Sequence, residues 1–359
     1  MESDLIHIHN WLRPLSWLYG LGVELRNLLF DNGLLRQKEF QLPVICIGNI
    51  SVGGTGKTPH TEYLLRLLLP KYRTAVLSRG YKRRSRGYQL AAADTPVEVI
   101  GDEPWQMKQK FPEAIVAVDA NRCRGIERLM SDDATSDVEV ILLDDAYQHR
   151  HVRAGLNIVL TDYHRLVTDD ALLPAGRLRE PVSGLARAQI IIVTKCPMGM
   201  APIDYRVIRS SLQLKPYQQL FFSAIHYGTL RPLFDSSSAA QTSITPDTHV
   251  LLLTGIASPQ QMYKDLQQCT RHITPLSFPD HHAYSKSDIA RIETSFAAMQ
   301  GSKRVIVTTE KDGARLLAAG SFTPIVRRHI FVLPIVADIL QGREPQLHKE
   351  IIEFISNCR

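Results

Sequence analysis

The glycine-rich stretch GNISVGGTGKTP, residues 48–59, directly follows a short apolar run. Residues 51–58 fit the phosphate-loop pattern GxxxxGK[ST], with serine in place of the first glycine. Such a loop turns backbone N–H groups toward phosphate oxygens, while the lysine neutralises the terminal phosphates and the final hydroxyl binds Mg²⁺. A glycine-rich turn without a ligand is the alternative. We predict that a nucleoside triphosphate is bound by Ser51, Val52, Gly53, Gly54, Thr55, Gly56, Lys57 and Thr58.

A second acidic signal complements this loop. The apolar run VEVILLDD ends in Asp144 and Asp145. In phosphate-loop enzymes a strand ending in Asp supplies a carboxylate to Mg²⁺. We therefore predict that Thr58 and Asp144 serve the metal and that Asp145 is a catalytic candidate beside Lys57. Two acids that only cap a strand are the alternative.

Several basic side chains also suit an anionic ligand. The stretch RGYKRRSRG, residues 79–87, holds five basic residues and begins with Arg79. It is either a solvated loop or a site for a phosphate or for lipid headgroups. His149, Arg177 and Arg179 are further candidates for contact with substrate or phosphate, and each could equally be structural.

A third motif, TTEKD, lies near the C-terminus at residues 308–312. It loosely resembles a base-recognition loop, so Glu310 is a candidate acceptor for the adenine amino group. Asp312 could instead cap the helix that follows.

These residues need a scaffold that brings them to one edge. Short β-branched apolar runs without alternation are separated by segments of helical pattern, which indicates a parallel sheet covered on both faces. We predict an α/β fold with a phosphate-loop core domain at residues 37–218 and a smaller α/β domain at 219–359, where the pattern restarts. The runs are residues 44–47, 74–78, 114–119, 138–145, 156–162, 189–195, 220–227, 249–257, 304–309 and 329–335.

The N-terminal segment, residues 1–36, stands apart from both domains. Its stretch at 11–35 is rich in Leu and carries two Trp and a Tyr, but Arg13, Glu24 and Arg26 interrupt it. It is too short and too charged to span a bilayer. It is either an amphipathic helix in the membrane interface or a helix packed on the core, and the aromatic residues favour the interface.

Bulk composition fits this picture. The chain has 359 residues, 44% hydrophobic and 22% charged, which excludes a disordered protein. Its net charge of +6 favours anionic partners, but the basic residues are spread along the chain, so we expect no nucleic acid. The five cysteines show no CxxC pairing, which is typical of a reduced chain without a cysteine metal site.

Taken together, the motifs resemble the tetraacyldisaccharide 4′-kinase family. The resemblance covers nearly the whole chain and includes the serine at the first loop position. Two of the matching stretches depart from the usual family pattern: DDAYQHR has Ala146 and Tyr147 where the family usually has Gly and Phe, and AGRLREP has Arg177 where Pro is usual. These departures affect local loop shape and not the chemistry. Besides the glycine-rich stretch, the matching motifs are PLSWLYG, SRGYKR, GDEP, DDAYQHR, LLPAGRLREP, FPDHHAY and TTEKDGARL.

The resemblance implies a phosphoryl transfer and a cleft between two domains. ATP with Mg²⁺ would donate its γ-phosphate to the 4′-hydroxyl of a tetraacylated glucosamine disaccharide 1-phosphate, giving lipid IVA. It assigns the catalytic base to Asp102 of the core domain and an orienting imidazole to His281 of the second domain, so that domain closure completes the site. Physical reasoning alone does not separate His281 from His282.

The same resemblance implies a monomer at the cytoplasmic face of the bacterial inner membrane. The N-terminal helix would then contact the lipid surface. A membrane-associated regulatory ATPase or GTPase is the alternative function, because it would share the phosphate loop and the interfacial helix but would need no sugar acceptor.

Overall fold

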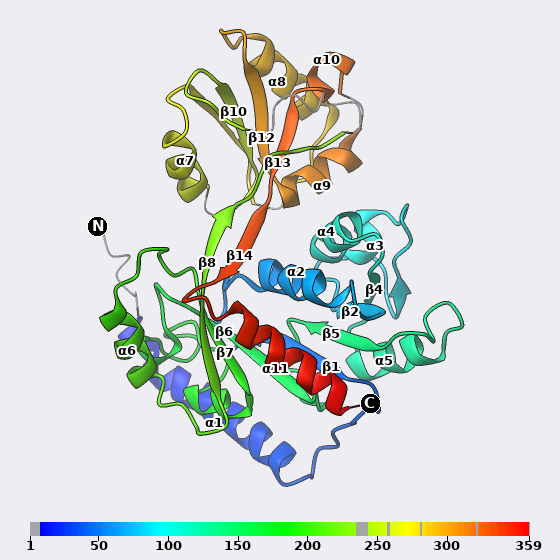
Figure 1. Ribbon diagram of the computed structural model, residues 1–359, viewed down its shortest axis with the longest axis vertical. Helices are drawn as coiled ribbons and strands as arrows, with labels where there is room; N and C mark the ends of the chain where they lie inside the picture. Colours follow the sequence, from blue (N-terminus) through cyan, green and yellow to red (C-terminus); the bar gives the residue numbers. More distant parts are fainter. Residues whose placement is uncertain (1–7, 235–242, 257–258, 281, 321, 359) are drawn as a thin grey trace. The chain divides into compact units, whose positions relative to one another are not determined.

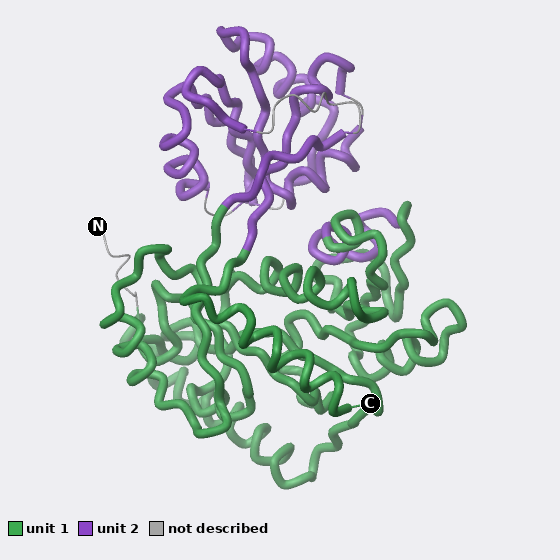
Figure 2. Tube along the Cα trace, in the orientation of Figure 1, with its two compact units in different colours: residues 1–94, 107–226, 337–359 green, residues 95–106, 227–336 purple. Residues whose placement is uncertain are grey.

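The structure is a computed structural model that describes residues 8–234, 243–256, 259–280, 282–320 and 322–358. The chain divides into two compact units, coloured separately in Figure 2. Unit 1 consists of residues 1–94, 107–226 and 337–359, and unit 2 of residues 95–106 and 227–336.

Unit 1 is built on a mostly parallel sheet. Among the described residues, nine strands pair in the order β14-β8-β7-β6-β1-β5-β2-β4-β3, and only the short β3 is shown to run antiparallel to its neighbour. The strands are β1 (Val44–Asn49), β2 (Thr74–Ser78), β3 (Gln89–Leu90), β4 (Ile115–Val118), β5 (Val140–Asp144), β6 (Leu156–Asp162), β7 (Ile190–Thr194), β8 (Gln219–Tyr227) and β14 (Ile335–Ile339). The predicted α/β class with a parallel core sheet is confirmed.

Helices connect and cover these strands (Figure 1). They are α1 (Arg13–Asp31), α2 (Lys57–Leu68), α5 (Arg122–Ser131), α6 (Pro202–Ser211) and α11 (Glu344–Asn357), with short 3₁₀ turns at Asn10–Leu12, Val167–Asp169 and Val182–Arg187. The central strands β1, β2, β5 and β7 are buried along their whole length, which explains their continuous apolar runs. Helix α11 lies beside α2, since the Tyr63 hydroxyl is 2.7 Å from Nε2 of His348.

Unit 2 contains a smaller sheet of the same kind. Its five strands pair in the order β11-β10-β12-β13-β9, parallel except for β9. The strands are β9 (Arg231–Pro232), β10 (His249–Thr254), β11 (Ile273–Ser277), β12 (Arg304–Thr309) and β13 (Ile330–Leu333). The helices are α3 (Val97–Ile100), α7 (Gln260–Gln267), α8 (Lys286–Ala297), α9 (Glu310–Ala319) and α10 (Pro324–Arg327), and α4 (Asp102–Lys110) crosses the boundary between the units.

The division differs from the predicted domains in three ways. Residues 95–106 belong to unit 2, although sequence order placed them in the core domain. Residues 337–359 return to unit 1, where β14 joins the edge of the sheet and α11 packs on it. The N-terminal segment is not a separate body, because α1 packs on unit 1 through its own side chains.

Helix α1 has an inverted distribution of polarity. Its outward side chains are large and apolar, including Trp17 at 69% exposed and Leu25 at 56%. Its buried residues are Ser16, Gly20 and Phe30. None of the helices in the described ranges combines the length and apolar character that a membrane span needs.

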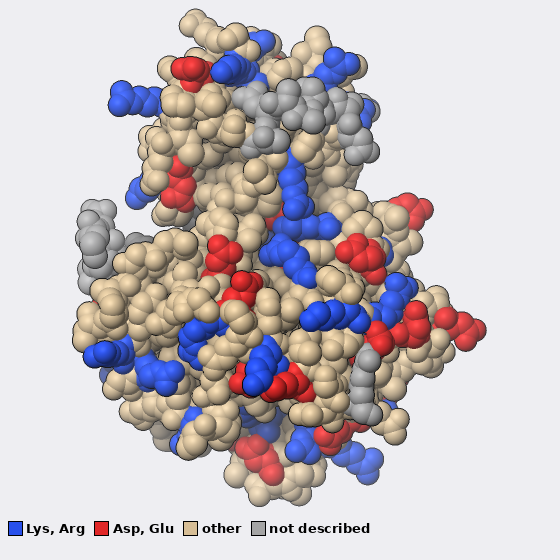
Figure 3. Space-filling view, viewed as in Figure 1, with Lys and Arg blue, Asp and Glu red and all other residues tan. Residues whose placement is uncertain are grey.

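Charged side chains of both signs are interspersed on the face that Figure 3 shows. This agrees with the modest net charge of +6.

Candidate active site

The phosphate loop connects β1 to α2, as predicted. Gly53 and Gly56 have φ angles of +119° and +84°, which residues with a side chain rarely adopt. A Cβ added at Gly53 or Gly54 would meet open space, so the concave side of the loop is accessible to a ligand. Helix α2 begins at Lys57, and its first N–H groups have no partner within the helix and face the loop.

Two side chains behind the loop hold its carbonyl groups. The Thr194 hydroxyl, at the end of β7, donates to the Thr55 carbonyl at 2.8 Å. Nδ1 of His60 lies 2.7 Å from the Gly56 carbonyl, and its Nε2 lies 2.8 Å from the Ser223 hydroxyl on β8. Burial lowers the pKa of His60 to about 4, so the ring is neutral, with Nδ1–H donating and Nε2 accepting.

The charged residues of the loop gather at the carboxyl end of β1. Nζ of Lys57 lies 3.8 Å from the carboxylate of Asp145 and 3.5 Å from Oδ1 of Asn49. Arg179 donates to the same Asp145 carboxylate at 3.1 Å. Asp145 adopts a φ of +45°, a conformation uncommon for a residue other than glycine. Lys57, Asp145 and Arg179, all predicted site residues, are therefore brought together.

Asp144 lies at the end of β5, directly beside β1 in the sheet register. Its buried carboxylate accepts from the Thr61 hydroxyl at 3.0 Å. Thr58 lies one turn before Thr61 and so faces the same strand end. No cluster of three His, Cys, Asp or Glu suited to a metal occurs in the described ranges. One carboxylate and one hydroxyl fit Mg²⁺, which takes its other ligands from water and substrate phosphates.

The segment at residues 177–179 pairs with the first half of the loop through backbone hydrogen bonds. The Val52 N–H donates to the Arg177 carbonyl and the Arg179 N–H to the Ile50 carbonyl, both at 2.7 Å. Ser51 and Leu178 form the antiparallel bridge between them. The Arg179 guanidinium also donates to Asn49, whereas the Arg177 side chain is exposed.

His149 lies between basic groups. It lines two pockets, of about 220 and 780 Å³, that also share Gln37. Burial and then the nearby charge of Arg122 lower its pKa to about 4, so the ring is neutral. A neutral imidazole there can donate a hydrogen bond to a polar ligand or accept one from it.

The basic stretch after β2 has mixed roles. Arg83 turns inward, where its guanidinium donates to the Val118 and Gly87 carbonyls. Arg79 is exposed, and its charge contributes to the lowered pKa of His149. The structure thus brings Arg79 near His149 and assigns Arg83 to the fold.

Asp102 belongs to unit 2, which corrects its predicted place in the core domain. It begins α4, and its carboxylate accepts from Arg315 at 2.6 Å. Arg315 is buried and also donates to Asp312 and to the Gly255 carbonyl. His281, its predicted partner, lies outside the described residues. His282 is paired with Asp288 at 3.0 Å.

Glu310 is the first residue of α9. Its carboxylate accepts from Nε2 of Gln106 and from the Ile335 N–H, both at 3.3 Å. The cap of this helix is Thr309, whose hydroxyl accepts from the Asp312 N–H. A role for Glu310 in binding adenine stays a prediction.

A family model described as tetraacyldisaccharide-1-P 4′-kinase matches residues 8–356. The chain belongs to this family.

Individual relatives of the tetraacyldisaccharide 4′-kinase family agree. The chain is 51% identical over 356 residues to the tetraacyldisaccharide 4′-kinase of Phocaeicola vulgatus, covering 99% of this chain and 97% of the relative. It is 52% identical to that of Bacteroides fragilis over 359 residues, covering 99% and 95%. Among solved structures, LpxK from Aquifex aeolicus in complex with ATP superimposes with a TM-score of 0.74 at 29% identity, covering 97% of this chain and 99% of that one.

Several residues around this kinase-family site were not predicted from sequence. The phosphate loop is supported by hydrogen bonds that involve His60, Thr194 and Ser223. Arg122 donates to the Asp119 and Asp144 carbonyls at 2.6 and 3.5 Å. Their residue types carry no motif, and their roles depend on which strands become neighbours. Only the sheet order could have revealed them.

Proposed function

We propose that this protein transfers the γ-phosphate of ATP to the 4′-hydroxyl of tetraacyldisaccharide 1-phosphate, giving lipid IVA. The observation that carries the proposal is the phosphate loop with Lys57, Asp145 and Arg179 converging on it, in a chain that matches the 4′-kinase family from residue 8 to 356. Two cationic side chains, Lys57 and Arg179, together with the backbone N–H groups of the loop, suit a triphosphate at this strand end.

The loop residues bind and orient the nucleotide. Backbone N–H groups of residues 53–58 would cradle the β-phosphate, and Lys57 would exchange its contact with Asp145 for the γ-phosphate oxygens. Charge that develops on those oxygens in the transition state is thereby stabilised without reorganisation of water. Mg²⁺, held by Thr58 and Asp144, would neutralise the β- and γ-phosphates when bound.

Asp102 is the proposed base for the acceptor hydroxyl, with His281 as its partner. Arg315 fixes the orientation of the Asp102 carboxylate at 2.6 Å, which suits a group that must accept one specific proton. The engagement of His282 with Asp288, and its stacking on Phe278 with ring centroids 4.9 Å apart, supports His281 over His282. Glu310, His149, Arg79 and Arg177 remain candidates for ligand contact.

The proposed location is the cytoplasmic face of the inner membrane. The outward face of α1 carries Trp17, Leu21 and Leu25, which water solvates poorly. Their exposure on one helix side fits a helix that lies in the lipid interface, where the acylated acceptor is also held. The monomeric state expected from sequence remains part of this proposal.

The decisive experiment supplies [γ-³²P]ATP, Mg²⁺ and the disaccharide 1-phosphate in detergent and follows radiolabelled lipid in a single turnover. We expect a bisphosphorylated lipid whose formation needs the acceptor. ATP hydrolysis that is indifferent to the acceptor would instead support the regulatory ATPase.

The same assay tests the proposed base. Asp102→Ala should slow transfer about 10²–10⁴-fold with little change in ATP affinity, because the carboxylate acts on the acceptor. The Asp102→Ala/His281→Ala double variant should be little slower than the slower single variant if the two act as a unit. Losses that multiply fully would contradict the dyad.

A further inference from the structure

The inward face of α1 contacts loops instead of an apolar core. Ser16 donates to the Leu172 carbonyl and accepts from the Ala175 N–H, both at 2.9 Å. Gly20 packs so closely that an added Cβ would lie 2.7 Å from Leu172. Helix α1 is therefore fastened to the segment at residues 171–180 through polar contacts and close approach.

Tyr19 of this helix is linked to the phosphate loop through Arg179. The Tyr19 hydroxyl donates to the Arg179 carbonyl at 2.9 Å. The N–H of the same Arg179 donates to the Ile50 carbonyl, and its guanidinium reaches Asn49 and Asp145. A single residue thus stands between α1 and the nucleotide loop.

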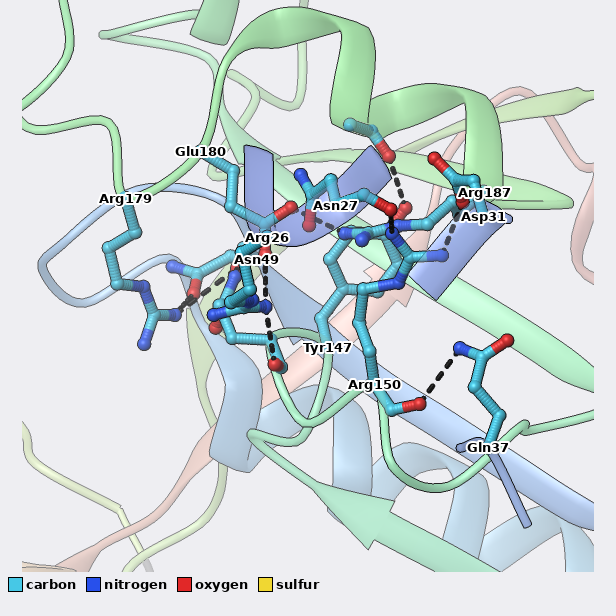
Figure 4. Close-up of polar contacts among 12 residues, drawn as sticks. Arg26, Asn27, Asp31, Gln37, Asn49, Tyr147, Arg150, Arg179, Glu180 and Arg187 are labelled. Carbon is cyan, nitrogen blue, oxygen red and sulfur yellow. Dashed lines mark hydrogen bonds and ion pairs between the residues drawn. The ribbon is translucent and has the colours of Figure 1, made fainter. Parts of the chain in front are cut away.

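A second link runs through Gln148, which follows Asp144 and Asp145 in the sequence. The Arg26 guanidinium donates to the Gln148 carbonyl at 2.9 Å, and the Gln148 side chain donates to the Asn49 carbonyl at 2.7 Å. Figure 4 shows Arg26, Asn49 and Arg179 grouped in this network. Both links end on Asn49 and its neighbour, the last residues before the loop turns.

Buried charge makes the second link costly to break. Glu180 is 1% exposed, and its carboxylate lies 2.5 Å from Arg187 and 4.0 Å from Arg26. Removal of Arg26 would take a positive charge away from a buried carboxylate and leave the Gln148 carbonyl without that donor. Such losses displace the groups that remain.

We infer that Tyr19 and Arg26 of α1 are positioning residues of the nucleotide site, acting through Arg179 and Gln148. The lipid-facing helix is then also a brace for the phosphate loop. This inference rests on the proposed function only in taking ATP as the ligand of the loop. Small displacements of a phosphate-binding loop reduce affinity and rate strongly, since the contacts are directional.

The test measures equilibrium affinity for Mg²⁺–ATP in detergent, without lipid or acceptor, for Tyr19→Phe and Arg26→Gln. We expect the Kd to rise about 3- to 10-fold in each, as loss of one supporting hydrogen bond predicts. Arg26→Lys, which keeps a charged donor, should recover part of the affinity. Arg13→Gln is the matched control, because Arg13 lies on the same helix with an exposed side chain, and its Kd should equal that of wild type.

Thermal unfolding of each variant accompanies the titrations. An ATP Kd within twofold of wild type for both Tyr19→Phe and Arg26→Gln would overturn the inference, as would an equal loss in Arg13→Gln. A drop in melting temperature with unchanged Kd would make the contacts merely structural and would also overturn it. If wild type binds ATP but transfers nothing to the disaccharide, the proposed function fails. The ATP Kd values of the variants still test whether Tyr19 and Arg26 position the phosphate loop.

Discussion

Helices α1 and α2 are both rich in leucine, yet they use it in opposite ways. Helix α2 buries Leu64, Leu65 and Leu68 against the sheet. Helix α1 exposes Leu18, Leu21 and Leu25 and packs through Ser16 and Gly20. The difference shows that composition does not decide which side of a helix faces the protein.

What each helix packs against explains the contrast. Helix α2 lies on the buried strands β1 and β5, where a polar side chain costs desolvation free energy unless it is hydrogen-bonded, as His60 and Thr61 are. Helix α1 lies on loops whose carbonyl and N–H groups need partners, and Ser16, Tyr19 and Arg26 supply them. Its leucines remain exposed, as the proposed lipid contact requires.

The largest effect should come from the N-terminus of α2. Lys57→Ala should lower the rate of phosphoryl transfer at saturating ATP by at least about 10²–10³-fold, because the lysine stabilises charge on the γ-phosphate. The measurement is single-turnover transfer to the disaccharide. Asp144→Ala should also cripple transfer, and near-normal turnover by either variant would contradict the site.

A Leu→Ala substitution should destabilise the protein much more in α2 than in α1. Leu65→Ala, in the core, should lower the free energy of unfolding by about 2–5 kcal/mol. Leu25→Ala, on the exposed face of α1, should change it by less than about 0.5 kcal/mol. Urea denaturation of the detergent-free protein measures both, and equal losses would mean that α1 also packs through its leucines.

His60 on α2 should make stability depend on pH. Its pKa of about 4 in the folded protein is below the usual 6.5, so the unfolded state binds more protons between these values. Stability is therefore complete above pH 6.5 and falls as the pH drops toward 4, by about 2 kcal/mol between pH 7 and 5.

His60→Gln should remove that part of the pH dependence in denaturant titrations at the two pH values. His149 titrates in the same direction, so a smaller dependence should persist. A slope unchanged by His60→Gln would show that the imidazole is not held neutral between Gly56 and Ser223.

The smallest predicted effect concerns lipid binding, which we expect to depend on the exposed leucines of α1. Leu25→Ser should lower partition onto phosphatidylethanolamine–phosphatidylglycerol vesicles by about tenfold, as expected for one leucine withdrawn from an apolar medium. Val207→Ser, an exposed position on α6, is the control and should leave partition unchanged. An equal loss at Val207 would extend the lipid contact beyond α1.

The sequence predicted most of the scaffold because its signals are local. Glycines at 53 and 56, the lysine after them and the aspartate at the end of an apolar run each carry their own pattern. Strands β2, β6 and β12 have the predicted bounds. Strand β11 was missed because it is an edge strand interrupted by Pro275, and the run at 329–335 divides into β13 and β14 at Pro334.

The remaining features depend on contacts between distant residues. Asp102 joins unit 2 because its helix pairs with Arg315, more than two hundred positions later, which no local pattern reports. The orientation of α1 could not be chosen from sequence for the same reason. The inward orientation of its polar side chains is explained only by their hydrogen bonds to residues 171–180 and to Gln148, which are distant in the sequence.

The return of the chain to unit 1 after unit 2 has a consequence for biogenesis. Strand β14, at the edge of the nine-stranded sheet, and helix α11, which lies beside the phosphate-loop helix α2, are both translated after residue 334. During synthesis, domains fold as units from the N-terminal side. The whole sequence of unit 2 is therefore synthesised before the sheet of unit 1 has its edge strand β14, and unit 1 is completed only when translation reaches the C-terminus.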